Sequence, residues 1–305
     1  MIVKDLYRIA LRKIRLFVFK IWEALHHPKI ATADDCEIDV IIAIIEKDLP
    51  VLPLCIEGLK KNVSHPIKNI YLVAPENQAI KIFAAENNLQ FVNEVSVLGY
   101  SPAQINYTVS TGMGLNRSGW IFQQLIKLSG KVGTCRYFLA IDADHVLLRP
   151  HVFLSEGKTV FYQSFDNNLP YYNSIKRLMG YYPVHWFSYV SHKMLFDKEV
   201  LKQLQKTIEE RNAGSWDQAI IRNLKTNEHS DFSEFELYGH FMNKAQKIHV
   251  SWREKALHIE KIASLQELQK KYPDKWSVSF SSYLHSPVLE YEKSWRNFFI
   301  KKAVK

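Results

Sequence analysis

The sequence lacks the residues and motifs that define several common protein classes. Its three cysteines (Cys36, Cys55 and Cys135) are widely spaced and odd in number, which argues against a disulfide framework or a zinc site and favours a reducing compartment. No G-x-x-x-x-G-K-S/T motif occurs, and no glycine-rich loop follows the first expected strand, so a P-loop nucleotide site is not expected. There is no repeat or low-complexity segment, and hydrophobic residues make up 47% of the chain, as in an ordinary globular protein.

Positive charge is concentrated at the two ends of the chain. Residues 1–30 carry a net charge of +5 and residues 291–305 a net charge of +4, which together account for the whole net charge of +9. The body between them is formally neutral, which is not the pattern of a nucleic-acid-binding fold. Basic ends on a neutral body suit an anionic membrane surface.

Residues 3–25 have the periodicity of an amphipathic helix. Its apolar side carries Val3, Leu6, Tyr7, Ala10, Ile14, Phe17, Val18, Ile21 and Leu25, and its opposite side carries Lys4, Arg8, Arg12 and Arg15. Charges interrupt the stretch too often for a bilayer span, which needs roughly 20 apolar residues, or for a cleaved signal peptide. Two interpretations stay open: the helix lies on a membrane surface, or it packs on the body of the protein. The basic, aromatic segment 295–302 favours the membrane.

Strands and helices alternate from residue 38 onward. The sequence predicts strands at 38–45, 70–74, 90–98, 159–165, 248–252 and 277–283, and helices at 52–62, 80–87, 119–128, 198–210, 216–224 and 264–271. Residues 101–118 are expected to form a long surface loop. The aromatic-rich residues 166–187 are too irregular for a plain helix, and either wall a binding pocket or form a satellite hydrophobic cluster. The alternation predicts right-handed crossovers and a doubly wound sheet.

Two carboxylates, Asp142 and Asp144, follow an apolar run that begins at Phe138. Ligands of open α/β sheets bind outside the carboxyl ends of the strands. Two carboxylates at such an end suit a hard divalent cation that also holds phosphate oxygens. A D-x-D in isolation is more often an ordinary polar turn, so the surrounding elements must decide. The next residue, His145, either approaches a bound phosphate or merely begins the next strand.

Three further motifs accompany this acidic pair. They are Arg117-x-Gly119-Trp120-x-x-Gln123-Gln124-x-x-Lys127, His192-x-Met194-Leu195-Phe196-Asp197 and Phe232-Ser233-Glu234-Phe235-Glu236-Leu237-Tyr238-Gly239. Together with Ile141-Asp142-Ala143-Asp144, the set resembles the GT-A superfamily of nucleotide-sugar glycosyltransferases, and within it a bacterial family of glycosyltransferases that is often described only as a domain of unknown function. The resemblance covers roughly residues 38–285.

The resemblance implies a GT-A-type (Rossmann-like) α/β fold, with a mixed, mostly parallel sheet flanked by helices. Residues 38–150 would form the nucleotide-sugar-binding half and residues 151–290 the acceptor-binding half of the same domain. Residues 1–37 would form the basic amphipathic N-terminal helix and a linker, and residues 291–305 the basic aromatic tail.

The resemblance also implies a bound Mn²⁺ or Mg²⁺ and a set of donor-binding residues. Asp144 would be the principal metal ligand, Asp142 would contact the donor ribose or the metal, and His285 or His258 would be a further ligand. Lys47 and Asp48 would lie near the nucleotide. Gln123, Gln124 and Lys127 would contact the donor or its phosphates, although for each residue alone an ordinary helix surface is the better interpretation.

Attack by a sugar hydroxyl needs a general base if the reaction inverts the anomeric carbon. Glu234 is the expected base, with Glu236 orienting the acceptor and Asp217 as the reserve candidate. A retaining enzyme would need none of these as a base.

The sequence therefore predicts a metal-dependent glycosyltransferase, peripheral on the inner, cytoplasmic face of a cell membrane. Its donor would be a nucleotide-sugar, by default a UDP-sugar, and its acceptor a glycan or lipid-linked saccharide of bacterial surface polysaccharide, lipopolysaccharide or capsule. Two other classes stay open: a nucleotidyl- or phosphotransferase that uses the same aspartates, and a non-catalytic binding protein on a degenerate glycosyltransferase fold.

Overall fold

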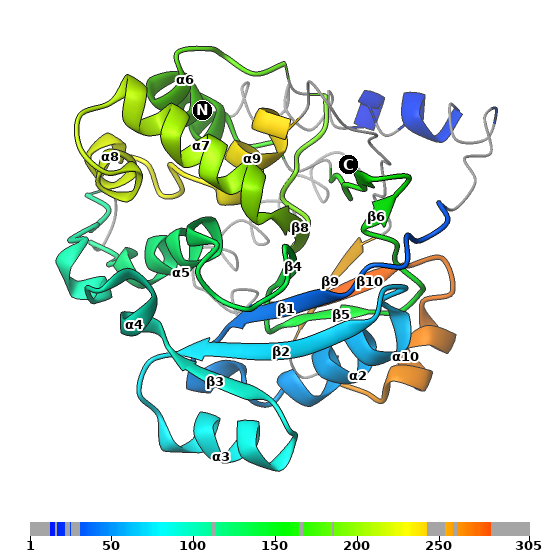
Figure 1. Cartoon of the computed structure of the whole chain (residues 1–305). Helices are drawn as coiled ribbons and strands as arrows, with labels where there is room; N and C mark the ends of the chain where they lie inside the picture. The colour runs from blue at the N-terminus through cyan, green and yellow to red at the C-terminus, as the bar shows by residue number, and fades with distance from the viewer. Residues whose placement is uncertain are drawn as a thin grey trace, which may run out of the picture.

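A central five-stranded sheet organises the chain, in the strand order β3-β2-β1-β4-β8 (Figure 1). The computed structural model describes residues 13–15, 17–21, 25, 31–110, 114–164, 167–184, 186–242, 254–258 and 261–281. Strands β1 (Ile38–Ala43), β2 (Ile67–Ala74), β3 (Gln90–Asn93) and β4 (Tyr137–Ile141) run parallel, and β8 (Lys193–Asp197) pairs antiparallel with β4. The expected α/β class with a mixed, mostly parallel sheet is confirmed.

The pleat of the central sheet separates two of the three hydrophobic clusters of the described residues, one on each face. On one face, Ile41, Phe138 and Phe196 belong to the cluster shared with α5 (Ser118–Ser129), α6 (Leu169–Met179), α7 (Lys198–Arg211), α8 (Trp216–Asn223) and α9 (Glu234–Met242). On the other face, Val40 and Leu139 pack with α2 (Leu52–Asn62) and α3 (Gln78–Glu86). Successive strand residues point to opposite faces, so a nearly continuous apolar run such as β1 is buried on both.

A buried carboxylate fixes β1 to the loop that leads into β4. Asp39 accepts hydrogen bonds from the backbone N–H groups of Thr134 at 2.6 Å and Cys135 at 2.8 Å. Gly133 precedes them with a φ of 80°, and a Cβ added there would lie 2.5 Å from the Asp39 carboxylate. Glycine is therefore required for this close approach.

A second sheet joins late residues to the acidic pair. Its order is β5 (His145–Leu147), β10 (Ser277–Ser281) and β9 (Glu254–His258). Phe280 N–H donates to the Asp144 carbonyl at 2.8 Å. Helix α10 (Leu265–Lys271) lies beside α2, and β6 (Leu154–Ser155) pairs with β7 (Lys158–Thr159). Within the described residues, no helix is long and apolar enough to cross a membrane.

Most of the predicted elements form, with boundaries shifted by a few residues. The helix at 52–62 has the predicted bounds, and the helices predicted at 80–87, 119–128, 198–210, 216–224 and 264–271 correspond to α3, α5, α7, α8 and α10. The strand predicted at 248–252 lies outside the described residues, as do residues 1–12 of the N-terminal helix and the tail 291–305.

Three predictions about local structure were wrong. The strand predicted at 90–98 ends at Asn93, whose side chain accepts from Val95 N–H and begins the short helix α4 (Glu94–Leu98). The strand predicted at 159–165 is reduced to β7, and part of the segment expected to be irregular forms α6, with a proline in its first turn. The predicted surface loop contains the 3-10 turn η2 (Pro102–Gln104) and buries Ile105, Tyr107 and Val109.

Gly239 in α9 allows this helix to pack closely on Tyr189. A Cβ added at Gly239 would meet the Tyr189 ring at 2.3 Å, whereas one added at Gly119 in α5 meets no atom within 4 Å. We expect Gly239→Ala to lower the free energy of unfolding by about 1–3 kcal/mol through overpacking. Gly119→Ala should raise it by up to about 1 kcal/mol through reduced unfolded-state freedom. Denaturant titration measures both, and equal stabilities would contradict the predicted clash.

Candidate active site

The candidate site lies at the topological switch point of the sheet. Strands β2 and β3 extend to one side of β1, and β4 lies on its other side. Strands β1 and β4 are parallel neighbours, so their carboxyl ends meet at one edge. Strand β4 ends directly before Asp142, and β1 is followed after two residues by the 3-10 turn η1 (Glu46–Asp48). Ligands of doubly wound folds bind in this crevice.

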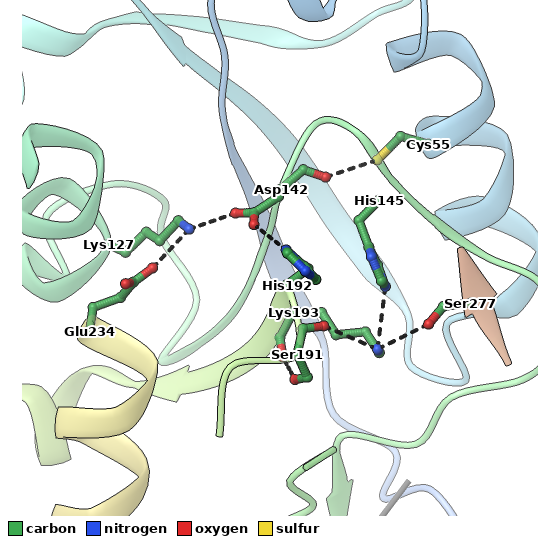
Figure 2. Close-up of polar contacts among 9 residues, drawn as sticks. All are labelled: Cys55, Lys127, Asp142, His145, Ser191, His192, Lys193, Glu234 and Ser277. Carbon is green, nitrogen blue, oxygen red and sulfur yellow. Dashed lines mark hydrogen bonds and ion pairs between the residues drawn. The ribbon is translucent and has the colours of Figure 1, made fainter. Parts of the chain in front are cut away.

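Asp142 is the centre of a polar network that draws on three elements (Figure 2). Its Oδ1 lies 2.7 Å from Lys127 Nζ of α5, and its Oδ2 lies 3.0 Å from His192 Nδ1, just before β8. Burial alone would raise the pKa of Asp142, but the charges of Lys127 and His192 hold it well below its usual range. About a third of the Asp142 side chain remains exposed, so it is an anchored carboxylate that still reaches solvent.

Lys127 joins the two acidic motifs of the sequence. Its buried ammonium group contacts Glu234 Oε1 at 2.9 Å in addition to Asp142. Burial lowers the pKa of Lys127, and the two carboxylates more than reverse this effect, so the lysine stays charged. Gln124, one turn earlier on α5, accepts the Glu234 backbone N–H at 3.1 Å. Helix α5 therefore positions the first turn of α9 against Asp142.

The negative charge of Asp142 raises the pKa values of two nearby carboxyl groups, those of Asp144 and Asp48. Burial, and then repulsion from Asp142, raise the pKa of Asp144 to about 6, with a smaller contribution from Asp48. Burial also raises the pKa of Asp48, to which Asp142 adds, while Lys47 acts in the opposite direction. In the part of the chain that the structure describes, no side chain forms an ion pair with Asp144. His192 and the backbone N–H of Asp144 itself favour the ionised form, but they only partly offset the effects of burial and of the neighbouring carboxylates.

This environment fits a divalent cation bound partly by substrate. The described residues contain no group of three or more His, Cys, Asp or Glu side chains that could hold a metal ion. Mg²⁺ and similar ions are commonly held by one or two carboxylates and completed by phosphate oxygens, which matches Asp142 and Asp144. His285 and the side chain of His258 lie outside the described residues, so their predicted role as ligands stays a prediction.

Two residues that the sequence analysis did not include among the site residues, His192 and Lys193, belong to this centre. His192 has a φ of 59°, in the left-handed region, which costs a non-glycine residue about 1–2 kcal/mol. In this conformation its carbonyl accepts Asp142 N–H at 2.9 Å while its ring reaches the Asp142 carboxylate. The only sequence signal for a role of His192 was its place in the motif that ends at Asp197. Its left-handed backbone conformation cannot be recognised from the amino-acid composition.

His145 begins β5 and does not project into solvent. Its buried ring stacks on His192 with centroids 5.4 Å apart, and Lys193 Nζ lies 3.3 Å from its Nε2. Burial, followed by the charge of Lys193, lowers the pKa of His145 well below the usual value, so the ring is neutral. Lys193 also donates to Ser191 O and Ser277 Oγ, each at 3.3 Å. These contacts connect β8 and β10 beneath the acidic pair.

The remaining predicted residues lie apart from Asp142. Glu236 is fully buried and accepts from Ser188 Oγ at 2.5 Å and Tyr172 OH at 3.3 Å. Helical residues two apart do not face each other, so Glu234 and Glu236 do not act as a pair. Asp217 accepts from Tyr100 OH at 2.9 Å at the start of α8. Gln123 is partly exposed on α5, and among the described residues no hydrogen bond or ion pair joins it to the network.

The fold and the site define an α/β protein with a carboxylate–lysine centre at the carboxyl ends of β1 and β4. The chain belongs to a family of unknown function (DUF6492), whose sequence model matches residues 37–287. This match confirms the predicted membership of a family without an assigned function. A search of curated proteins gave no match.

Several solved structures are similar to this chain. Mouse xyloside xylosyltransferase 1, in its apo form, shares 12% identity at a TM-score of 0.40, over 82% of this chain and 100% of that chain. Galactosyltransferase LgtC in complex with donor and acceptor sugar analogs shares 13% identity at 0.39, over 82% and 88%. Glycosyltransferase GlyE of Streptococcus pneumoniae shares 13% at 0.30, over 62% and 43%. Because these sequence identities and TM-scores are low, the activity of this chain cannot be taken from these structures and must be argued from its own site.

Replacing Lys127 tests the buried ion network. We expect Lys127→Met to lower the free energy of unfolding by about 3–5 kcal/mol, because it leaves the buried Glu234 without a counter-charge and Asp142 with His192 alone. Adding Glu234→Gln should recover part of the loss. The matched control is Lys61→Met, which breaks an exposed pair with Glu57 and should cost at most about 0.5 kcal/mol. Similar losses in denaturant titrations of the Lys127 and Lys61 variants would contradict the assignment.

Replacing Asp144 tests the crowding of negative charge. The raised pKa means that stability contributed by the protonated carboxyl is lost as the pH rises from the ordinary value of 3.8 to about 6. With a chelator present, Asp144→Asn should therefore raise the free energy of unfolding by about 1–2 kcal/mol at pH 8, by about half as much at pH 5, and hardly at all below pH 3.8, after allowance for partial solvent exposure. Asp35→Asn, at an exposed position, is the control and should change little at either pH. Destabilisation at pH 8 would contradict the prediction.

Proposed function

We propose that this protein is a metal-dependent glycosyltransferase that uses a nucleotide-sugar donor, by default a UDP-sugar. The observation that carries the proposal is the contrast between Asp142 and Asp144 at the switch point of the sheet. Asp142 is anchored by Lys127 and His192, while Asp144 has a raised pKa and no ion-pair partner in the described chain. A carboxylate pair of this kind suits a cation shared with a diphosphate.

The donor would bind along the edge formed by β1 and β4. Asp142 and Asp144 would hold Mn²⁺ or Mg²⁺, and the bound ion would offset charge on the departing nucleoside diphosphate. Lys47 and Asp48, in the turn after β1, would contact the nucleoside. Lys127 contacts Asp142 from the protein interior, with only 6% of its side chain exposed. Its proposed task is therefore to orient Asp142 rather than to bind phosphate.

The residues on the acceptor side remain predictions. Glu234 is proposed as the general base of an inverting reaction, but its Oε1 accepts from Lys127 and its side chain is only 5% exposed. Contact with an acceptor hydroxyl would require this bond to open. Glu236 and Asp217 are engaged by Ser188 and Tyr100, which supports positioning roles. The setting in surface polysaccharide, lipopolysaccharide or capsule synthesis rests on the sequence resemblance.

Calorimetric titration of UDP-, GDP- and CMP-sugars, with and without Mn²⁺, tests the donor and the metal together. We expect one nucleotide class to bind in a Mn²⁺-dependent manner, because Asp142 and Asp144 would hold a cation that offsets the charge of the diphosphate. Asp144→Ala should weaken binding by at least about 10–100-fold, whereas the exposed control Asp35→Ala should bind as the wild type does.

Equal donor binding by the wild type and Asp144→Ala would remove the metal role. The product formed during turnover separates the open reaction classes, because sugar transfer releases nucleoside diphosphate and nucleotidyl transfer releases pyrophosphate. Absence of any nucleotide-sugar binding would instead favour a non-catalytic protein.

A further inference from the structure

The N-terminal helix turns its apolar stripe outward. Ile14, Phe17, Val18, Ile21 and Leu25 recur at helical spacing on one side, and their exposed fractions range from 45% to 73%. Phe19, on a different side, is buried and packs edge-on against Phe187 with ring centroids 5.5 Å apart. The helix therefore contacts the body through Phe19. The five described residues of the expected apolar stripe are not buried on the protein.

A second exposed apolar segment borders this stripe. Val184 and Trp186 are exposed by 81% and 60%. Arg15 Nη1 donates to Trp186 O at 3.3 Å, and its guanidinium carbon lies 5.9 Å from the centroid of the Trp186 ring. Helix and segment are thus held together by Arg15–Trp186 and Phe19–Phe187. We call the five stripe residues, Val184 and Trp186 the outer apolar face.

The charge around the outer apolar face indicates which partner it fits. Lys13 and Lys20 are exposed and flank the stripe on one side, and Arg15 flanks it on the other. Residues 1–30 carry a net charge of +5, which disfavours self-association through this face but attracts anionic lipid at about 1 kcal/mol per basic residue. Tryptophan beside basic side chains is typical of the membrane–water interface.

We propose that the outer apolar face docks on an anionic lipid bilayer, with the helix lying in the plane of the interface. The segment that carries Trp186 continues into the candidate site. Ser188 donates to the buried Glu236, and His192 contacts Asp142. Docking would therefore bring the acceptor side of the site toward the lipid surface. Given the proposed sugar transfer, on which this last step rests, the acceptor class is lipid-linked.

Vesicle flotation without a sugar donor tests docking separately from catalysis. The vesicles are phosphatidylcholine alone, or phosphatidylcholine mixed with phosphatidylglycerol. We expect the full chain to bind only the anionic vesicles and to be released as salt is raised. Phe17→Ser/Ile21→Ser should weaken binding by at least about tenfold, because two large apolar side chains no longer enter the interface.

The matched control is Ile82→Ser/Val95→Ser, which removes two exposed apolar side chains on α3 and α4 and should leave flotation unchanged. Circular dichroism and donor titration should be the same for both double variants, so a failure of docking is distinguishable from a failure of the proposed function. Equal flotation of Phe17→Ser/Ile21→Ser and wild type would overturn the proposal. A dimer in light scattering that this variant dissociates would assign the face to a second copy instead.

Discussion

The site depends on the two ion pairs that the buried ammonium group of Lys127 forms. It lies between Asp142, at the end of a central strand, and Glu234, in the first turn of α9. A desolvated charge of this kind is tolerated only when it is closely paired, so the positions of α5, α9 and β4 are mutually constrained. The same pairing keeps Asp142 ionised and fixes its direction, which leaves its second oxygen for His192.

Two aspartates one residue apart experience opposite environments. Lys127 and His192 lower the pKa of Asp142, whereas burial and the neighbouring negative charges raise that of Asp144. Environments that push the pKa values of nearby titratable groups apart are a common basis for dividing tasks between them. Here Asp142 is held by two partners, whereas Asp144 has no ion-pair partner among the described residues, so a bound cation or a proton would relieve its crowded negative charge.

The sequence predicted the sheet class, most helices and the acidic pair, because apolar runs and helical spacing are local signals. It failed where a short-range contact or a tertiary one decided the outcome. The Asn93 side chain begins α4 inside an apolar run that resembles a strand. The proline and aromatic residues at the start of α6 made that segment look too irregular for a helix. Lys127 resembled a surface residue because its burial depends on α9. Two further features became visible only in the folded structure. They are the left-handed backbone of His192 and the different directions in which Glu234 and Glu236 point from one helix.

The hydrogen bond between Phe280 and Asp144 has a consequence for the order in which the protein is made. The acidic loop belongs to the first half of the chain, yet its backbone is held by a strand close to the other end, and Ser277 of the same strand contacts Lys193. A ribosome-bound chain can complete the parallel strands long before it can complete this loop. The candidate site thus completes its hydrogen bonds later in synthesis than the parallel strands β1 to β4.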